Sequence, residues 1–113
     1  MPDDGFYTIT NNTTTWGSFG QFWDDMGDNS PDHKGYMMVV NATYNPGLFY
    51  VQTVDGLCEN TEYYFSADIY NIIVGDNWIK PNVSFLLNGQ EVYNTCVIEE
   101  THTWETYGLS FVT

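Results

Sequence analysis

The feature that most limits what this chain can fold into is a strict alternation of apolar and polar residues within short segments. The clearest case is residues 63–70, where one parity is apolar and the other is mixed. Side chains alternate between the two faces of an extended strand, so the apolar parity predicts a buried face. The predicted inward set is Tyr63, Phe65, Ala67 and Ile69, and the predicted outward set is Tyr64, Ser66, Asp68 and Tyr70.

Other segments repeat this pattern, and turn signals separate them. The predicted strands are residues 5–10, 36–42, 48–54, 63–73, 82–87, 91–95 and 104–113. The Asn-Pro-Gly tripeptide at 45–47 predicts that the second and third of these form a hairpin, and Asn88-Gly89 predicts another between the fifth and sixth. The fourth, fifth and sixth strands are expected to form a meander, which would make residues 82–87 the neighbour of residues 63–73.

These short strands predict the fold class. Aromatic residues make up 18% of the chain and suit a half-buried pleated surface, and no segment has the pattern of a long helix. We therefore expect an all-β chain, a two-sheet antiparallel β-sandwich forming a single domain over residues 1–113. A closed barrel is the alternative, which the long and unequal loops disfavour.

Charge excludes some classes of partner. The net charge is -13, with Lys34 and Lys80 as the only basic residues besides histidine. A surface this negative repels phosphate backbones and anionic lipid headgroups, so no nucleic-acid partner and no membrane surface is expected. The sequence has no apolar stretch long enough for membrane insertion and no signal peptide. If the protein is secreted, its export signal lies outside this chain.

Several fragments resemble one family of secreted β-sandwich modules of gliding bacteria, found in large surface proteins associated with gliding motility. The fragments are "DDGFYTI" at 3–9, "DHKGYMMVVNATYNPGLFYVQTVDGLCENTEYYFSA" at 32–67, "IKPNVSFLLNG" at 79–89 and "TWETYGLSFVT" at 103–113. That family is similar in turn to jelly-roll carbohydrate-binding modules. The resemblance implies a galactose-binding-like jelly roll, a place in a secreted or cell-surface protein, and carbohydrate as a ligand.

The chain departs from that family at both ends. The family's opening strand and its closing strands have no counterpart here, so the domain is expected to be incomplete. We expect either a piece of a longer polypeptide or a protein partner, such as a second copy, that supplies strands to open sheet edges. The family often binds structural calcium through those terminal segments, and that site cannot be carried over.

Sugar binding in such modules rests on aromatic rings that stack on pyranose rings and on polar groups that bind hydroxyls. The candidate sugar-binding residues are Tyr64, Asp68, Tyr70, Asn82, Trp16, Trp23, Trp78 and Trp104. The alternative is that the aromatic residues cover the outer sheet or close the ends of the sandwich. Asp68 replaces a residue that is commonly aromatic in the family.

An acidic loop between residues 24 and 32 is the candidate metal site. Its carboxylates belong to Asp24, Asp25, Asp28 and Asp32, and several oxygen ligands in one loop suit calcium. The spacing matches no EF-hand, because Met26 stands where an oxygen ligand is needed. A solvated loop is the alternative reading, and calcium is the only cofactor that the sequence suggests.

The remaining sequence features concern the two cysteines and possible catalytic residues. Cys58 and Cys96 are expected at opposite ends of the meander, so we predict free, partly buried thiols rather than a disulfide. His33 and His102 are isolated, and no nucleophile elbow, HExxH motif or paired carboxylates stand out, so the chain is not expected to be an enzyme.

The expected function is a non-catalytic extracellular recognition or adhesion module that binds carbohydrate. The first alternative is a structural or self-assembling β-sandwich subunit that pairs its edge strands with neighbours and binds no small ligand. The second is an accessory piece of a glycoside hydrolase.

Overall fold

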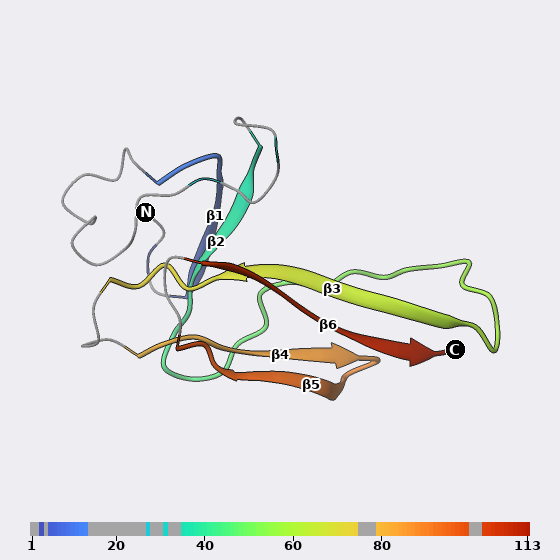
Figure 1. Ribbon diagram of the computed structural model, residues 1–113. Helices are drawn as coiled ribbons and strands as arrows, with labels where there is room; N and C mark the ends of the chain where they lie inside the picture. Colours follow the sequence, from blue (N-terminus) through green and yellow to red (C-terminus); the bar gives the residue numbers. More distant parts are fainter. Residues whose placement is uncertain are drawn as a thin grey trace. The chain divides into compact units, whose positions relative to one another are not determined.

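The computed structural model describes Asp3, residues 5–13, Gly27, Pro31 and residues 35–74, 79–99 and 103–113. The strands within this part of the chain are β1 (Phe6–Thr10), β2 (Met37–Asn41), β3 (Glu62–Tyr70), β4 (Asn82–Leu87), β5 (Gln90–Val97) and β6 (Trp104–Val112). The described residues contain no helix, so none can cross a membrane as an apolar helix. The structure is all-β, as the alternation predicted (Figure 1).

The chain divides into two compact units. The first comprises Met1–Val51 with Ile72–Trp78, and the second comprises Gln52–Asn71 with Ile79–Thr113. A single domain over residues 1–113 stays a prediction.

In the first unit, β1 pairs antiparallel with β2, from Phe6 opposite Asn41 to Thr10 opposite Met37. The Gly5 amide extends the ladder by donating a hydrogen bond to the Asn41 carbonyl at 2.6 Å. Met37 and Val39 alternate along β2 as its buried side chains, so one face of this apolar strand is shielded from solvent.

The predicted hairpin between residues 36–42 and 48–54 is wrong. Residues 48–54 form no strand, and β2 pairs with β1 instead. Leu48 and Val51 are 75% and 71% exposed. An apolar, β-branched composition favours a strand only when a neighbouring strand supplies hydrogen bonds and cross-strand contacts, and no described strand lies in register with this segment.

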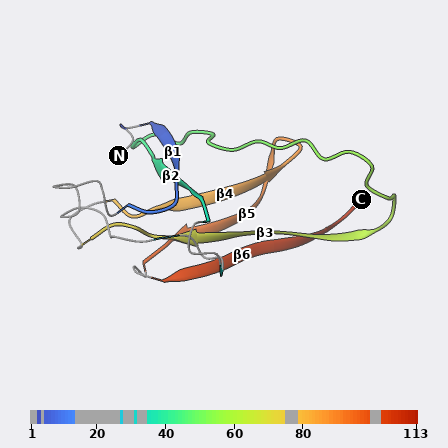
Figure 2. The same cartoon turned by 90° about the horizontal axis from the view of Figure 1, so that it is seen from above.

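The second unit contains two antiparallel ribbons whose strands run roughly along one direction in Figure 1 and Figure 2. In the first ribbon, β3 pairs with β6 over nine positions, from Glu62 opposite Val112 to Tyr70 opposite Trp104. The predicted meander is therefore wrong, because the partner of β3 is β6 and not β4. Strand β6 lies far from β3 in sequence, so no local turn signal announces the pairing.

The second ribbon is the hairpin of β4 and β5, which the sequence predicted. Its turn residues Asn88 and Gly89 have φ values of 52° and 81°. Two successive positive φ values are those of a type I′ turn, whose twist matches the flanking strands. The register shifts twice along this hairpin, once between Asn82 and Ser84 and once between Phe85 and Leu86.

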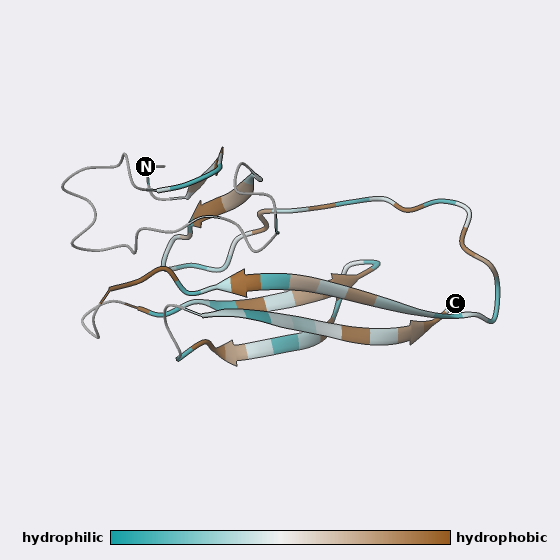
Figure 3. Ribbon diagram, turned by 45° about the horizontal axis from the view of Figure 1, so that its top comes forward, coloured by the Kyte–Doolittle hydropathy of each residue, from teal (hydrophilic) through white to brown (hydrophobic). Residues whose placement is uncertain are grey.

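Aromatic side chains pack the two ribbons of the second unit together. Phe65 of β3 meets Phe85 of β4 edge-to-face, with ring centroids 5.5 Å apart, and Phe85 also lies 5.5 Å from Tyr93 of β5. Phe111 shares the face of Phe65 and stacks on Tyr63 at 6.0 Å. Hydrophobic and hydrophilic residues alternate along these strands (Figure 3). Such antiparallel ribbons with an apolar layer between them are consistent with a β-sandwich.

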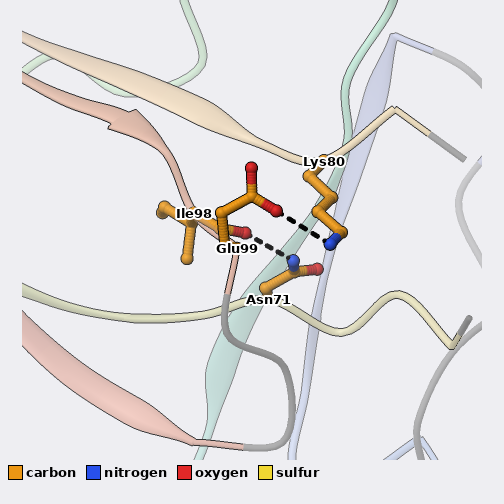
Figure 4. A network of polar contacts seen from close by, with 4 residues as sticks. All are labelled: Asn71, Lys80, Ile98 and Glu99. Atoms are coloured by element: carbon orange, nitrogen blue, oxygen red, sulfur yellow. Dashed lines mark hydrogen bonds and ion pairs between the residues drawn. The ribbon is translucent and has the colours of Figure 1, made fainter. Parts of the chain in front are cut away.

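A buried polar contact joins the end of β3 to the end of β5. Asn71 is 1% exposed, and its side-chain amide donates to the Ile98 carbonyl at 2.8 Å (Figure 4). The Ile98 amide donates to the Pro81 carbonyl at 2.8 Å, and Lys80 beside it forms an ion pair with Glu99 at 3.0 Å. The Asn71 bond joins the ends of the two ribbons, whereas the other two contacts close the open end of the β4–β5 hairpin.

The opposite end of the second unit is closed by Thr113. Its amide donates to the Thr61 carbonyl at 3.1 Å, and its hydroxyl donates to the Cys58 carbonyl. Cys58 is thereby held beside the start of β3, whereas Cys96 precedes the Ile98 contact at the end of β3. Nine residues of strand, at about 3.3 Å each, separate these ends, so no disulfide can join them. Both thiols are free as predicted, but they are exposed rather than partly buried.

Candidate ligand-binding face of β3 and β6

One face of the β3–β6 ribbon carries the side chains from which the candidate site is built. We call it the outer face, because the other face carries Phe65 toward Phe85. Antiparallel register places residues of matching parity on the same face of both strands. The outer face consists of Tyr64, Ser66, Asp68 and Tyr70 from β3 and of Trp104, Thr106, Gly108 and Ser110 from β6.

An aromatic pair forms one end of the outer face. Tyr70 and Trp104 are directly opposite in the register, and their ring centroids are 5.3 Å apart with the planes tilted by 57°. Both side chains are half-buried. Cross-strand aromatic pairs of this kind stabilise a ribbon and hold both rings in place. The pair therefore offers a fixed, partly exposed aromatic surface.

A hydrogen-bonded carboxylate lies at the middle of the outer face. Asp68 and Thr106 are opposite in the register, and the Thr106 hydroxyl donates to Asp68 Oδ1 at 2.6 Å. Both residues are exposed. The bond orients the carboxylate, and a carboxylate has several acceptor sites to which a ligand hydroxyl can donate.

Tyr64 forms the other end of the outer face, and it leans across β6. A Cβ atom on Gly108 would lie 2.6 Å from the Tyr64 hydroxyl and 2.8 Å from Cζ, so the tip of the ring occupies the space above this glycine. The side chain is nevertheless 65% exposed. Because the ring is exposed and lies across the neighbouring strand, a ligand can stack on it.

The charge of the outer face is negative. Glu62 has the same parity as Tyr64, so it adds a second carboxylate to that of Asp68. Neither β3 nor β6 contains a lysine or arginine. Lys80, the one lysine among the described residues, is paired with Glu99. The face therefore suits ligands that are neutral or cationic.

The structure thus brings four of the eight predicted sugar-binding residues onto one face, and they are Tyr64, Asp68, Tyr70 and Trp104. Asn82 lies on β4, in the other ribbon, and therefore does not belong to the outer face. Trp16, Trp23 and Trp78 lie outside the described residues, as do the candidate calcium ligands Asp24, Asp25, Asp28 and Asp32. The described residues themselves hold no cluster of three or more side chains that could bind a metal.

Sequence reasoning overlooked Gly108 as part of this site. A glycine inside a strand often marks a place where another group approaches closely, and this signal was present in the alternating segment that became β6. The glycine alone does not indicate which residue approaches it, because that depends on the pairing of β6 with β3.

A second group of polar side chains lies on the other ribbon. Asn94 of β5 donates through its side-chain amide to the Ser84 hydroxyl at 2.8 Å, and Ser84 is hydrogen-bonded to Glu91. All three side chains are exposed. This group carries no aromatic residue, so it lacks the stacking surface of the outer face.

Comparison of the chain with models of known protein families, with curated proteins and with solved structures gives no match.

Proposed function

We propose that this chain is a non-catalytic carbohydrate-binding module of jelly-roll type, part of a secreted or cell-surface protein, and that its ligand binds on the outer face of β3 and β6. The observation that supports this function is the register of the two strands. It places the Tyr70–Trp104 pair, the Asp68–Thr106 bond and the Tyr64 ring on one surface.

The chemistry of that surface suits a sugar. Pyranose rings have apolar faces that stack on aromatic side chains, and their hydroxyls donate to carboxylate and hydroxyl oxygens. The outer face supplies both kinds of group. Tyr70 and Trp104 pack on each other, so little side-chain entropy is lost from this pair when a ligand binds.

Affinity electrophoresis through gels that contain a soluble glucan, mannan or xylan tests the proposal. We expect at least one of these gels to retard the protein. The Tyr70→Ala and Trp104→Ala variants should lose about tenfold in affinity, because each removes a stacking surface worth roughly 1 kcal/mol or more. Tyr44→Ala is the matched control, since Tyr44 is 87% exposed and lies in the first unit.

Two results would overturn the sugar-binding function. One is free migration in every gel, and the other is retardation that neither outer-face variant changes. Near-ultraviolet circular dichroism of each variant shows whether its fold is retained, so that a loss of binding is not mistaken for unfolding.

The exposed apolar segment at residues 48–54 favours a second candidate function, that of a self-assembling subunit. Leu48, Val51 and Val54 are all exposed, and the described residues 48–54 form no strand. Sedimentation velocity as a function of protein concentration tests this function. Association should strengthen with salt, because salt screens the repulsion between two chains that each carry a net charge of -13, and Val51→Lys should abolish it.

A further inference from the structure

The length of the outer face indicates what size of ligand it can hold. Tyr64 and Tyr70 are six positions apart on β3. At about 3.3 Å per residue, their backbones are roughly 20 Å apart. The Tyr64 ring reaches over Gly108, which is opposite Ser66, so the aromatic surfaces themselves are about four residues, or roughly 13 Å, apart. A single pyranose ring is far shorter than this, so one sugar unit reaches only one of the two aromatic surfaces.

Between these aromatic surfaces the face is polar, and the tip of the Tyr64 ring lies above Gly108 at one end of it. Ser66 and Gly108 are directly opposite in the register, and Asp68 and Thr106 are the next outward pair along the strands. The outer face therefore has a row of short, hydrogen-bonding side chains between its two aromatic surfaces. A ligand that contacts both ends would lie along this stretch, parallel to the strands.

The negative charge of the outer face favours uncharged glycans over acidic ones. Glu62 and Asp68 lie on the outer face, neither strand carries a basic residue, and the whole chain has a net charge of -13. A glycan with carboxylate or sulfate groups would be repelled along its entire length. A neutral glycan avoids this repulsion and donates hydroxyl protons to the carboxylate of Asp68.

We propose that the outer face binds a linear, uncharged oligosaccharide, a trisaccharide or longer, that runs along β3 from Tyr64 to the Tyr70–Trp104 pair. This proposal rests on the carbohydrate-binding function proposed above. Because the two aromatic surfaces belong to one rigid ribbon, binding at one end raises the effective concentration of the ligand at the other. Affinity should therefore rise steeply with chain length until both ends are filled, and then level off.

Isothermal titration of the intact chain with cello-, manno- and N-acetylglucosamine oligosaccharides, from disaccharide to hexasaccharide, tests the proposal. For the sugar that binds best, we expect the hexasaccharide to bind about a hundredfold more tightly than the disaccharide. The Tyr64→Ala variant should lose about tenfold for the hexasaccharide, while its affinity for the disaccharide changes less than twofold. Tyr64→Phe retains the ring and should behave like the unaltered protein.

The outcomes separate this inference from the function on which it rests. Equal affinity for short and long oligosaccharides, with binding still lost in Tyr70→Ala, would overturn the inference and leave the sugar-binding function standing. Binding of hexagalacturonate as tight as that of the neutral hexasaccharide at low salt would also overturn it. Absence of binding by every oligosaccharide would overturn both.

Discussion

Residues 48–54 and strand β3 have similar apolar, strand-forming sequences, but they adopt different structures. Phe49 and Phe65 illustrate the difference, because both are 44% exposed. Phe65 lies on a strand that pairs with β6 over its whole length and packs against Phe85 of the other ribbon. Phe49 lies in a segment without strand pairing. An apolar pattern therefore describes what a segment can bury, whereas a partner strand decides whether it forms a strand at all.

The largest difference between the two regions should appear when an aromatic ring is removed from each. Phe85→Ala deletes the ring that contacts both Phe65 and Tyr93, so we expect the free energy of unfolding to fall by about 3 kcal/mol or more. Phe49→Ala should cost less than about 1 kcal/mol. Urea unfolding followed by tryptophan fluorescence measures both changes. Equal losses would show that residues 48–54 belong to a packed core after all.

Two glycines extend the comparison to the backbone. A Cβ atom on Gly108 would lie 2.5 Å from the Phe65 carbonyl oxygen, so Gly108→Ala must push β3 and β6 apart. We expect a loss of about 2 kcal/mol in the free energy of unfolding. A Cβ atom on Gly47 would meet nothing within 4 Å, so Gly47→Ala should be neutral or slightly stabilising. If Gly108→Ala were neutral in the same urea titration, the close approach of the two strands would be refuted.

The buried amide of Asn71 should have the next largest effect. In Asn71→Ala the Ile98 carbonyl loses its hydrogen bond in a buried position, which should cost about 1–2 kcal/mol. Asn45→Ala is the control, since Asn45 is exposed just before residues 48–54, and it should change the free energy of unfolding by less than about 0.5 kcal/mol. The midpoints of thermal unfolding report both effects. A neutral Asn71→Ala would mean that water replaces this contact.

Only part of the fold and of the candidate site follows from the sequence. The turn at Asn88-Gly89 and the two faces of β3 were predictable, because each follows from neighbouring residues. The pairing of β3 with β6 was not, since Tyr70 and Trp104 are far apart in sequence and no local signal joins them. The outward parity of Tyr64 and Tyr70 was therefore predicted correctly, but that they share one face with Trp104 and Thr106 followed only from the register.

The smallest expected effect concerns a residue that adopts a glycine-like conformation. Cys96 has a φ of 58°, a left-handed value that costs a side-chain-bearing residue about 1 kcal/mol relative to glycine. It lies where the register shifts between Asn82 and Ser84; its amide donates a hydrogen bond to Asn94 Oδ1 at 2.7 Å, and its carbonyl accepts one from the Thr95 hydroxyl at 2.7 Å. Because the Cys96 side chain is exposed, little packing is lost when it is removed.

Cys96→Gly should accordingly raise the free energy of unfolding by about 0.5–1 kcal/mol, as a residue held at positive φ gives way to one that adopts it freely. Cys58→Gly is the matched control, because Cys58 is also an exposed thiol but does not have a positive φ. Its added freedom in the unfolded chain should lower the stability slightly. The two substitutions should therefore have opposite signs in urea unfolding, and a loss of stability in both would contradict the left-handed conformation at Cys96.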